Sequence, residues 1–264
     1  RAAGPAGALS GQGAVTSSAR SPEPLTASAE TRPFVMPEYE QTELLYENAL
    51  ASPADVEDWT LEGNAAITFP QGRMRVENTD DPAEVDEPHY VLWCPERFPD
   101  GIKVSYDVYP LAEPGLCMLF FAATGTDGKH VLDDGLADRT GIYGQYTDGD
   151  IDALHVSYFR RNHHGDPRDE IAFQTVNLRK SSGFHLAERG GDPIPSVKDA
   201  DPPYRIEVYK DGPEVSFAVD GLEVLSWTDD GESYGPVLEG GSIGFRQMAP
   251  TMAEYANLSV HAIE

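Results

Sequence analysis

Residues 205–227 read RIEVYKDGPEVSFAVDGLEVLSW, and this stretch decides the fold. In it Val215, Phe217 and Val219 alternate with small or polar residues. Apolar residues at every second position are typical of a strand that buries one face. The Asp-Gly pair at 220–221 stands between two such runs and matches a two-residue hairpin turn, whose backbone needs positive φ. The stretch therefore predicts consecutive antiparallel strands.

Short extended runs of the same kind continue on both sides of this stretch, with turn residues between them and almost no helical period. This pattern indicates an all-β fold, a two-sheet antiparallel sandwich. We expect a single domain over residues 36–264. Residues 1–35 are rich in Ala, Gly, Ser and Pro without an apolar period, so we expect a disordered tail there. An opening strand is expected at 44–49, and the further strands at 65–69, 73–77, 89–93, 102–109, 116–123, 154–160, 171–178, 204–210, 214–219, 222–227, 242–247 and 255–263.

Composition excludes several classes of protein. The formal net charge is −26, so the surface would repel nucleic-acid phosphates. The sequence lacks an apolar run of about 18 residues, the length needed for a membrane span. Two cysteines do not form a disulfide framework, although a bridge between Cys94 and Cys117 stays open. These cysteines and the lack of a signal-type apolar core favour the cytoplasm slightly over secretion.

A local positive region interrupts this acidity. Residues 155–189 hold six of the 19 Lys and Arg residues and four of the seven His residues, with only four acids among them. Two strand-like runs carry most of these cations. Because the rest of the chain is negative, we expect this region to recognise an anionic ligand.

Several motifs resemble a known family. The final hairpin, then GSIGFRQM and then EYANLSVH, resembles the end of concanavalin-A-like lectin and glucanase sandwiches. The resemblance to the YesU-like family, domain of unknown function 1961, covers about residues 38–264. It implies a concanavalin-A-like jelly roll and an association with the breakdown of pectin-type polysaccharides, but it supplies no established activity. The motifs that carry it are VLWCPERFPDG, EPGLCMLFFAA, HVSYFRR, NLRKSSGFHL, WTDDGESYGP and GFRQMAP.

Glycoside hydrolysis on this fold needs an acid and a facing nucleophile or base. Lectin-fold glucanases carry them as Glu-x-Asp-x-(x)-Glu on one strand, and that pattern is absent here. The nearest match, residues 84–89, lies in a proline-interrupted acidic segment that reads as a loop. A hydrolase would have to use unpatterned acids such as Asp107, Asp152 or Glu170.

The positive region suits β-elimination on a uronic acid. This reaction needs a base for the C5 proton, an acid for the leaving oxygen, and a cation or amide that neutralises the carboxylate. We predict His155 or Tyr158 as the base or acid. Strand alternation places His155 and Arg161 on one face and Tyr158 and Arg160 on the other. Either face could line the ligand groove, and the sequence does not choose between them. A buried structural histidine is the alternative for His155.

The remaining predicted site residues serve to bind the ligand. Arginine forks hold carboxylates, amides orient them, and tyrosines in a glycine-rich loop stack on sugar faces. Salt bridging to the abundant acids is the alternative role for the arginines. The predicted substrate-binding residues are Arg160, Arg161, Asn177, Arg179, Arg246, Gln247, Tyr143 and Tyr146.

The expected function is therefore that of a carbohydrate-active protein. We expect its partner to be an acidic oligo- or polysaccharide, cleaved as by a polysaccharide lyase, with no cofactor. The Asp-rich residues 147–152 resemble a short calcium loop but lack its full ligand spacing, so a structural Ca²⁺ is the alternative there. A non-catalytic carbohydrate-binding module and a glycoside hydrolase are the alternative functions.

Overall fold

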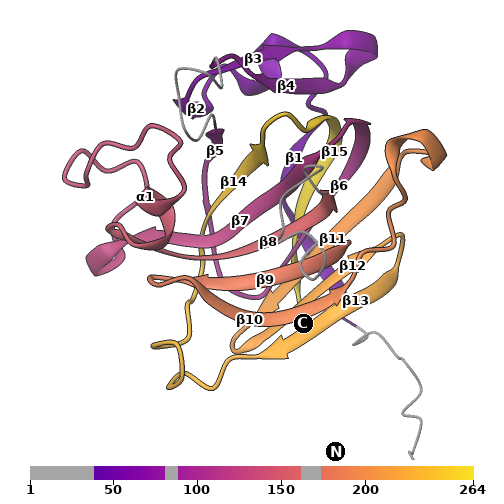
Figure 1. Ribbon diagram of the computed structural model, residues 1–264. Helices are drawn as coiled ribbons and strands as arrows, with labels where there is room; N and C mark the ends of the chain where they lie inside the picture. The colour runs from indigo at the N-terminus through magenta and orange to yellow at the C-terminus, as the bar shows by residue number, and fades with distance from the viewer. Residues whose placement is uncertain (1–38, 81–88, 162–173) are drawn as a thin grey trace, which may run out of the picture. The chain divides into compact units, whose positions relative to one another are not determined.

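Two antiparallel β-sheets face each other in the computed structural model, which describes residues 39–80, 89–161 and 174–264 (Figure 1). The predicted tail at 1–35 lies outside the described residues. The all-β, two-sheet antiparallel sandwich predicted from the alternating runs is confirmed. The described helices are short, η1 (Pro53–Val56), η2 (Pro70–Gly72), η3 (Thr126–Gly128), α1 (Gly144–Thr147) and η4 (Val197–Asp199). None of them has the length and apolar character needed to cross a membrane.

The first sheet, sheet A, contains the hairpins that the sequence marks most clearly. Its turn at 220–221 joins Val219 to its partner Leu222, which confirms the predicted two-residue hairpin. Asp220 and Gly221 both have positive φ, at 52° and 75°. In order across sheet A the strands are β13 (Leu222–Thr228), β12 (Glu214–Val219), β11 (Tyr204–Asp211), β6 (Ile102–Ala112), β15 (Met252–Ile263), β4 (Met74–Asn78) and β3 (Ala65–Thr68), with β1 (Gln41–Asn48) also paired to β15.

The second sheet, sheet B, carries the predicted positive region. Neither of its edge strands, β10 (His185–Gly191) and β2 (Thr60–Gly63), was predicted; β10 is polar and shows no alternation of buried and exposed residues, and β2 has only four residues. In order across sheet B the strands are β10 (His185–Gly191), β9 (Thr175–Ser181), β8 (Ile151–Arg161), β7 (Gly115–Gly125), β14 (Gly241–Met248), β5 (His89–Phe98) and β2 (Thr60–Gly63).

The main hydrophobic core lies between the inner faces of the two sheets. Tyr106 of sheet A and Tyr158 of sheet B are both fully buried there, and their hydroxyls form a hydrogen bond of 2.8 Å. This bond satisfies two polar groups that burial would otherwise leave unpaired. Cys94 and Cys117 are buried in the same core and are both free, so no bridge joins them.

A second apolar cluster covers part of the outer face of sheet B. Trp93, Met118 and Phe120 project from this face and pack against Val131 and Tyr146 of the segment 126–150. Figure 1 shows this segment, with α1, beside β7 and β8. The segment therefore covers one portion of the outer face and leaves the neighbouring portion open.

Candidate functional site

A groove occupies the open portion of the outer face of sheet B. Its volume is about 360 Å³, which falls within the roughly 300–1,000 Å³ typical of ligand sites. Its lining combines cationic, amide and hydroxyl groups with apolar side chains. The described lining residues are His89, Leu116, Met118, Tyr143, Ser157, Arg160, Asn177, Arg179, Phe184, Arg246 and Met248.

A bulge in β8 decides which arginine reaches this groove. Up to Tyr158 the strand alternates, so Ser157 faces the groove and Tyr158 faces the core. Phe159 has a φ of 47°, and the pairing of β8 with β7 shifts register at this point. As a result Phe159 also faces the core, and Arg160 takes the groove side that simple alternation gives to Arg161.

Three arginines from three strands line the groove. Arg160 comes from β8, Arg179 from β9 and Arg246 from β14. Burial, followed by repulsion from Arg179 and Arg189, lowers the pKa of Arg160 to about 10. Burial also lowers the pKa of Arg179, and Arg189 adds to this effect. Like charges held together at a partly buried surface favour an anion between them.

Arg246 also holds the segment that borders the groove. Its Nη1 donates to the carbonyl of Gly141 at 2.7 Å, and its guanidinium carbon lies 4.8 Å from the ring centre of Tyr143. Gly141 has a φ of 91°, and a Cβ there would lie 2.1 Å from the carbonyl oxygen of His89. Only glycine allows this close approach to β5, so Gly141 fixes where Tyr143 stands.

Arg160 and Asn177 are held by a neighbouring hydroxyl. The Arg160 Nη1 donates to Thr175 Oγ1 at 2.8 Å, and Thr175 Oγ1 lies 3.1 Å from Asn177 Oδ1. Asn177 faces Ser157 across the β8–β9 pair, as His155 faces Arg179. The register thus places an amide and a hydroxyl directly beside the cations.

Tyr143 joins the groove to a buried histidine. Its hydroxyl lies 2.7 Å from Nε2 of His155, and its ring packs edge-on against Phe184 with centres 5.5 Å apart. His155 is fully buried below it, beside Phe120. Burial, together with the positive charges of Arg179 and Arg246, lowers the pKa of His155 to about 3. This histidine is therefore neutral near pH 7, and Tyr143 connects it to the groove.

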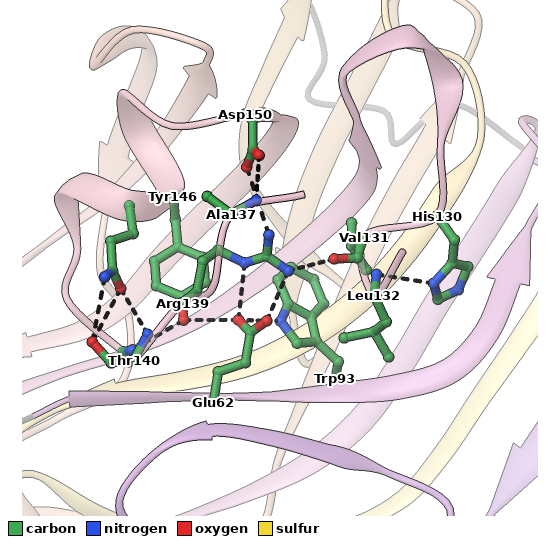
Figure 2. Close-up of polar contacts among 12 residues, drawn as sticks. Glu62, Trp93, His130, Val131, Leu132, Ala137, Arg139, Thr140, Tyr146 and Asp150 are labelled. Atoms are coloured by element: carbon green, nitrogen blue, oxygen red, sulfur yellow. Dashed lines mark hydrogen bonds and ion pairs between the residues drawn. The ribbon is translucent and has the colours of Figure 1, made fainter. Parts of the chain in front are cut away.

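A largely buried carboxylate, that of Glu62, anchors the segment that carries Tyr143, and Figure 2 shows its polar contacts with Arg139, Trp93 and Tyr146. Glu62 of β2 accepts a bidentate pair of hydrogen bonds from Arg139, at 2.7 and 3.1 Å. It also accepts from the Trp93 indole at 2.9 Å and from the Tyr146 hydroxyl at 2.8 Å. Arg139 donates in addition to the carbonyl of Val131. One carboxylate thus ties residues 131–146 to sheet B.

Two predicted site residues lie on the core side instead of in the groove. Tyr158 is completely buried against Tyr106 between the sheets, so it cannot contact a ligand, which corrects its prediction as a catalytic residue. Gln247 also faces inward, where its side-chain oxygen accepts from the Tyr255 hydroxyl at 2.8 Å and its NH₂ group donates to the Val76 carbonyl at 3.0 Å. Because neighbours on a strand point to opposite faces, Arg246 in the groove requires Gln247 in the core.

Two further residues that were predicted to bind the ligand form hydrogen bonds with other parts of the protein instead. Arg161 pairs with Asp192 at 3.0 Å and donates to the carbonyl of Ile194, outside the groove. Tyr146 is completely buried and donates to Glu62, so it supports the segment and does not stack on a ligand. The sequence predicted both residues as ligand contacts, and the bulge at Phe159 and the carboxylate of Glu62 account for the difference.

Sequence reasoning did not assign several residues at the groove to the site. Phe184 is half exposed at the groove, with the Arg179 guanidinium stacked 3.6 Å from its ring centre. Arg189 pairs with Asn177 in the β9–β10 register and adds positive charge. Met118 supplies apolar surface. A Ser-Gly-Phe turn after the β9 run could have indicated a hairpin, which would have brought Phe184 and Arg189 back beside the groove.

The two candidate acids that the structure describes, Asp107 and Asp152, lie away from the groove. Asp107 pairs with Arg205 on sheet A at 3.1 Å, and Asp152 accepts from the Ser182 backbone at 3.1 Å. Glu170 lies outside the described residues. None of the described residues that line the groove is a carboxylate. The two acids that a hydrolase needs are not supplied by this part of the lining.

The Asp-rich residues 147–152 use their carboxylates separately. Asp148 accepts from Thr147 Oγ1 at 2.9 Å, Asp150 accepts from the backbone of Ala137 at 2.6 Å, and Asp152 is bonded to Ser182 as described. Within the described ranges, no group of three or more His, Cys, Asp or Glu side chains converges as metal ligands would. This geometry differs from that of a calcium loop.

Comparison with known proteins agrees with this architecture. The family described as domain of unknown function (DUF1961) matches residues 43–260. The uncharacterized protein YesU of Bacillus subtilis (strain 168) is 51% identical over 223 residues, which cover 84% of this chain and 97% of that protein.

Solved structures show the same fold. A crystal structure of a protein of unknown function with a galectin-like fold from Bacillus subtilis matches with a TM-score of 0.79 and 51% identity, covering 85% of this chain and 98% of that chain. The kappa-carrageenase of Pseudoalteromonas carrageenovora, solved with an oligotetrasaccharide of kappa-carrageenan, matches with a TM-score of 0.51 and 10% identity, covering 89% of this chain and all of that chain. The second likeness concerns the fold alone.

Proposed function

For this chain, which belongs to the DUF1961 family, we propose a carbohydrate-active function: it binds an acidic, uronate-containing oligo- or polysaccharide in the groove of sheet B and cleaves it by β-elimination. The observation that carries this proposal is the meeting of Arg160, Arg179 and Arg246 from three strands of one sheet face. These three arginines lie together in a molecule whose formal charge is −26.

The groove has the chemistry that a sugar acid requires. Arginine forks bind carboxylates through two parallel hydrogen bonds, and Arg179 forms no ion pair with any described residue. Asn177 and Ser157 offer hydrogen bonds to hydroxyl groups. Leu116, Met118 and Phe184 offer apolar surface for the C–H faces of a pyranose ring. This combination supports an acidic saccharide over a neutral one.

Elimination is supported over hydrolysis by the same lining. The described part of the groove supplies cations and a tyrosine but no pair of carboxylates. In β-elimination the carboxylate gains negative charge as C5 loses its proton, and arginines placed beside it stabilise that charge. A solved carrageenase and this chain share only the sandwich, which is compatible with catalysis on such a scaffold.

The experiment that tests the proposal incubates the protein with pectin fragments, alginate and glucuronan. We expect ultraviolet absorbance from a C4=C5 unsaturated product with at least one of them. New reducing ends without this absorbance would support a glycoside hydrolase instead. Saturable binding without either product would indicate a carbohydrate-binding module, and no binding to any uronate polymer would refute the proposal as a whole.

A further inference from the structure

Burial determines which residue donates in the hydrogen bond between Tyr143 and His155. Nε2 of His155 lies 2.7 Å from the Tyr143 hydroxyl, while Nδ1 is buried without a hydrogen-bond partner among the described residues. The neutral ring carries one proton, on one of these two nitrogens. A buried N–H without a partner is rarer in proteins than a buried acceptor without one. The proton therefore belongs on Nε2, where it donates to the Tyr143 oxygen.

This direction changes what Tyr143 can do. Its oxygen accepts from His155, so its own proton is directed away from His155. If that proton leaves, the His155 N–H continues to stabilise the phenolate through a charge-assisted bond. A neutral histidine that donates suits this task, and two nearby arginines oppose a second proton on the ring.

Positive groups face Tyr143 from each strand that packs against it. Arg160 comes from β8, Arg179 from β9 and Arg246 from β14, the last 4.8 Å from the ring centre of Tyr143, whereas His155 of β8 is neutral. Burial raises the pKa of Tyr143, and the three arginines oppose this effect, leaving it at about 12.

We infer that Tyr143 is the catalytic residue that carries the proton in the elimination, and that His155 is a positioning residue that acts through it. This inference rests on the proposed function of the groove. It moves the catalytic role from Tyr158, which is buried in the core, to a tyrosine that lines the groove.

Tyr143 alone can carry the proton through the whole elimination. The phenolate of Tyr143 takes the C5 proton of the uronate, and the C5–H electron pair becomes the C4=C5 double bond. The C4–O4 bond breaks, and its electron pair goes to O4. The proton then passes from Tyr143 to O4, which restores the phenolate and releases an unsaturated uronate and a new reducing end. Arg160, Arg179 and Arg246 stabilise the charge that gathers on the carboxylate meanwhile.

The test compares Tyr143→Phe with wild type on whichever uronate polymer the wild type cleaves. We expect kcat to fall by about 10²- to 10⁴-fold, the usual contribution of a general acid–base group, while the dissociation constant stays within about 3-fold. Tyr109→Phe, on sheet A, serves as the matched control and keeps full activity. Tyr143→Phe with more than about a third of wild-type kcat would overturn the inference and leave the proposed function intact.

The pH profile of the wild type tests the same step without a substitution. Because the phenolate is the minor form at neutral pH, kcat/KM should rise about tenfold per pH unit from pH 7 towards pH 10. A bell centred below pH 7 would overturn the role of Tyr143. Uronate binding without cleavage would overturn the elimination and this inference together.

The positioning role of His155 has its own pair of variants. Gln at 155 keeps an N–H near the position of Nε2, whereas Leu removes it. We expect His155→Gln to keep most of kcat, and His155→Leu to lose about 10- to 100-fold in kcat, with KM unchanged and the rise in rate moved to higher pH. Equal losses in both variants would show that His155 only fills space.

Discussion

Replacing Glu62 by the uncharged Gln should be the most damaging charge-removing substitution in the hydrogen-bond network that holds the groove. The Glu62 side chain is 11% exposed and that of Arg139 is 4% exposed, so both charges are largely desolvated. Glu62 receives four hydrogen bonds, two of them from Arg139. A Gln amide offers one acceptor oxygen and turns its NH₂ group towards a donor. Arg139 would then stay buried without its bidentate partner.

The expected loss in the free energy of unfolding follows from the burial of the Glu62–Arg139 pair. Removing one partner of a buried ion pair costs about 3–5 kcal/mol. In a domain of this size that corresponds to a fall in Tm of roughly 10 °C. Because the network holds residues 131–146, the loss should also weaken ligand binding through displacement of Tyr143.

Urea denaturation of Glu62→Gln provides the assay, with Glu47→Gln as the matched control. Glu47 is exposed on β1, so its substitution should change the free energy of unfolding by less than about 0.5 kcal/mol. A double-mutant cycle with Arg139→Met isolates the coupling between Glu62 and Arg139. If Glu62→Gln costs less than about 1 kcal/mol, or the cycle shows no coupling, the network does not hold the segment as argued.

Three further predictions concern other parts of the account. Tyr158→Phe should cost about 1–3 kcal/mol of stability, because it leaves the Tyr106 hydroxyl buried without its partner, and should leave activity unchanged; a large loss of kcat would return Tyr158 to the catalytic site. His155 has a pKa of about 3 in the folded protein against about 6.5 when unfolded, so its contribution to stability is complete above pH 6.5 and is lost as the pH falls towards 3. Wild type should therefore lose about 1.4 kcal/mol per pH unit more than His155→Gln in that window, measured by denaturation at several pH values, and parallel curves would contradict a buried neutral histidine. Gly141→Ala should lower both stability and ligand affinity, because its Cβ would meet the carbonyl of His89; Gly212→Ala, in an open turn, separates the effect of this clash from the cost of positive φ.

The fold could be predicted because its signals are local. Alternation along the strands and the turn at 220–221 each depend on a few neighbouring residues, and both were read correctly. Strand β10 was missed because an edge strand with polar residues buries no regular face.

The site could be predicted from the sequence only in part, for a different physical reason. Alternation places Ser157 and Asn177 together, as the β8–β9 register does. The bulge at Phe159 depends on the pairing of β8 with β7, a contact between strands that no local pattern shows. Tyr143 and Tyr146 stand three residues apart in a segment without period, so only the structure separates the one in the groove from the one bonded to Glu62.

The central claim is that the arginines of the groove bind the carboxylate of a sugar acid. Isothermal titration of a uronate oligosaccharide and of its carboxyl-reduced, neutral counterpart tests this claim most directly, using wild type, Arg179→Gln and Arg205→Gln. The account predicts that wild type prefers the acid, and that Arg179→Gln weakens its binding by about 10-fold or more, the value of a charge-assisted hydrogen bond. Arg205→Gln, on sheet A, should leave binding unchanged. Equal affinity for the acidic and neutral sugars, or equal effects of the two substitutions, would contradict the account.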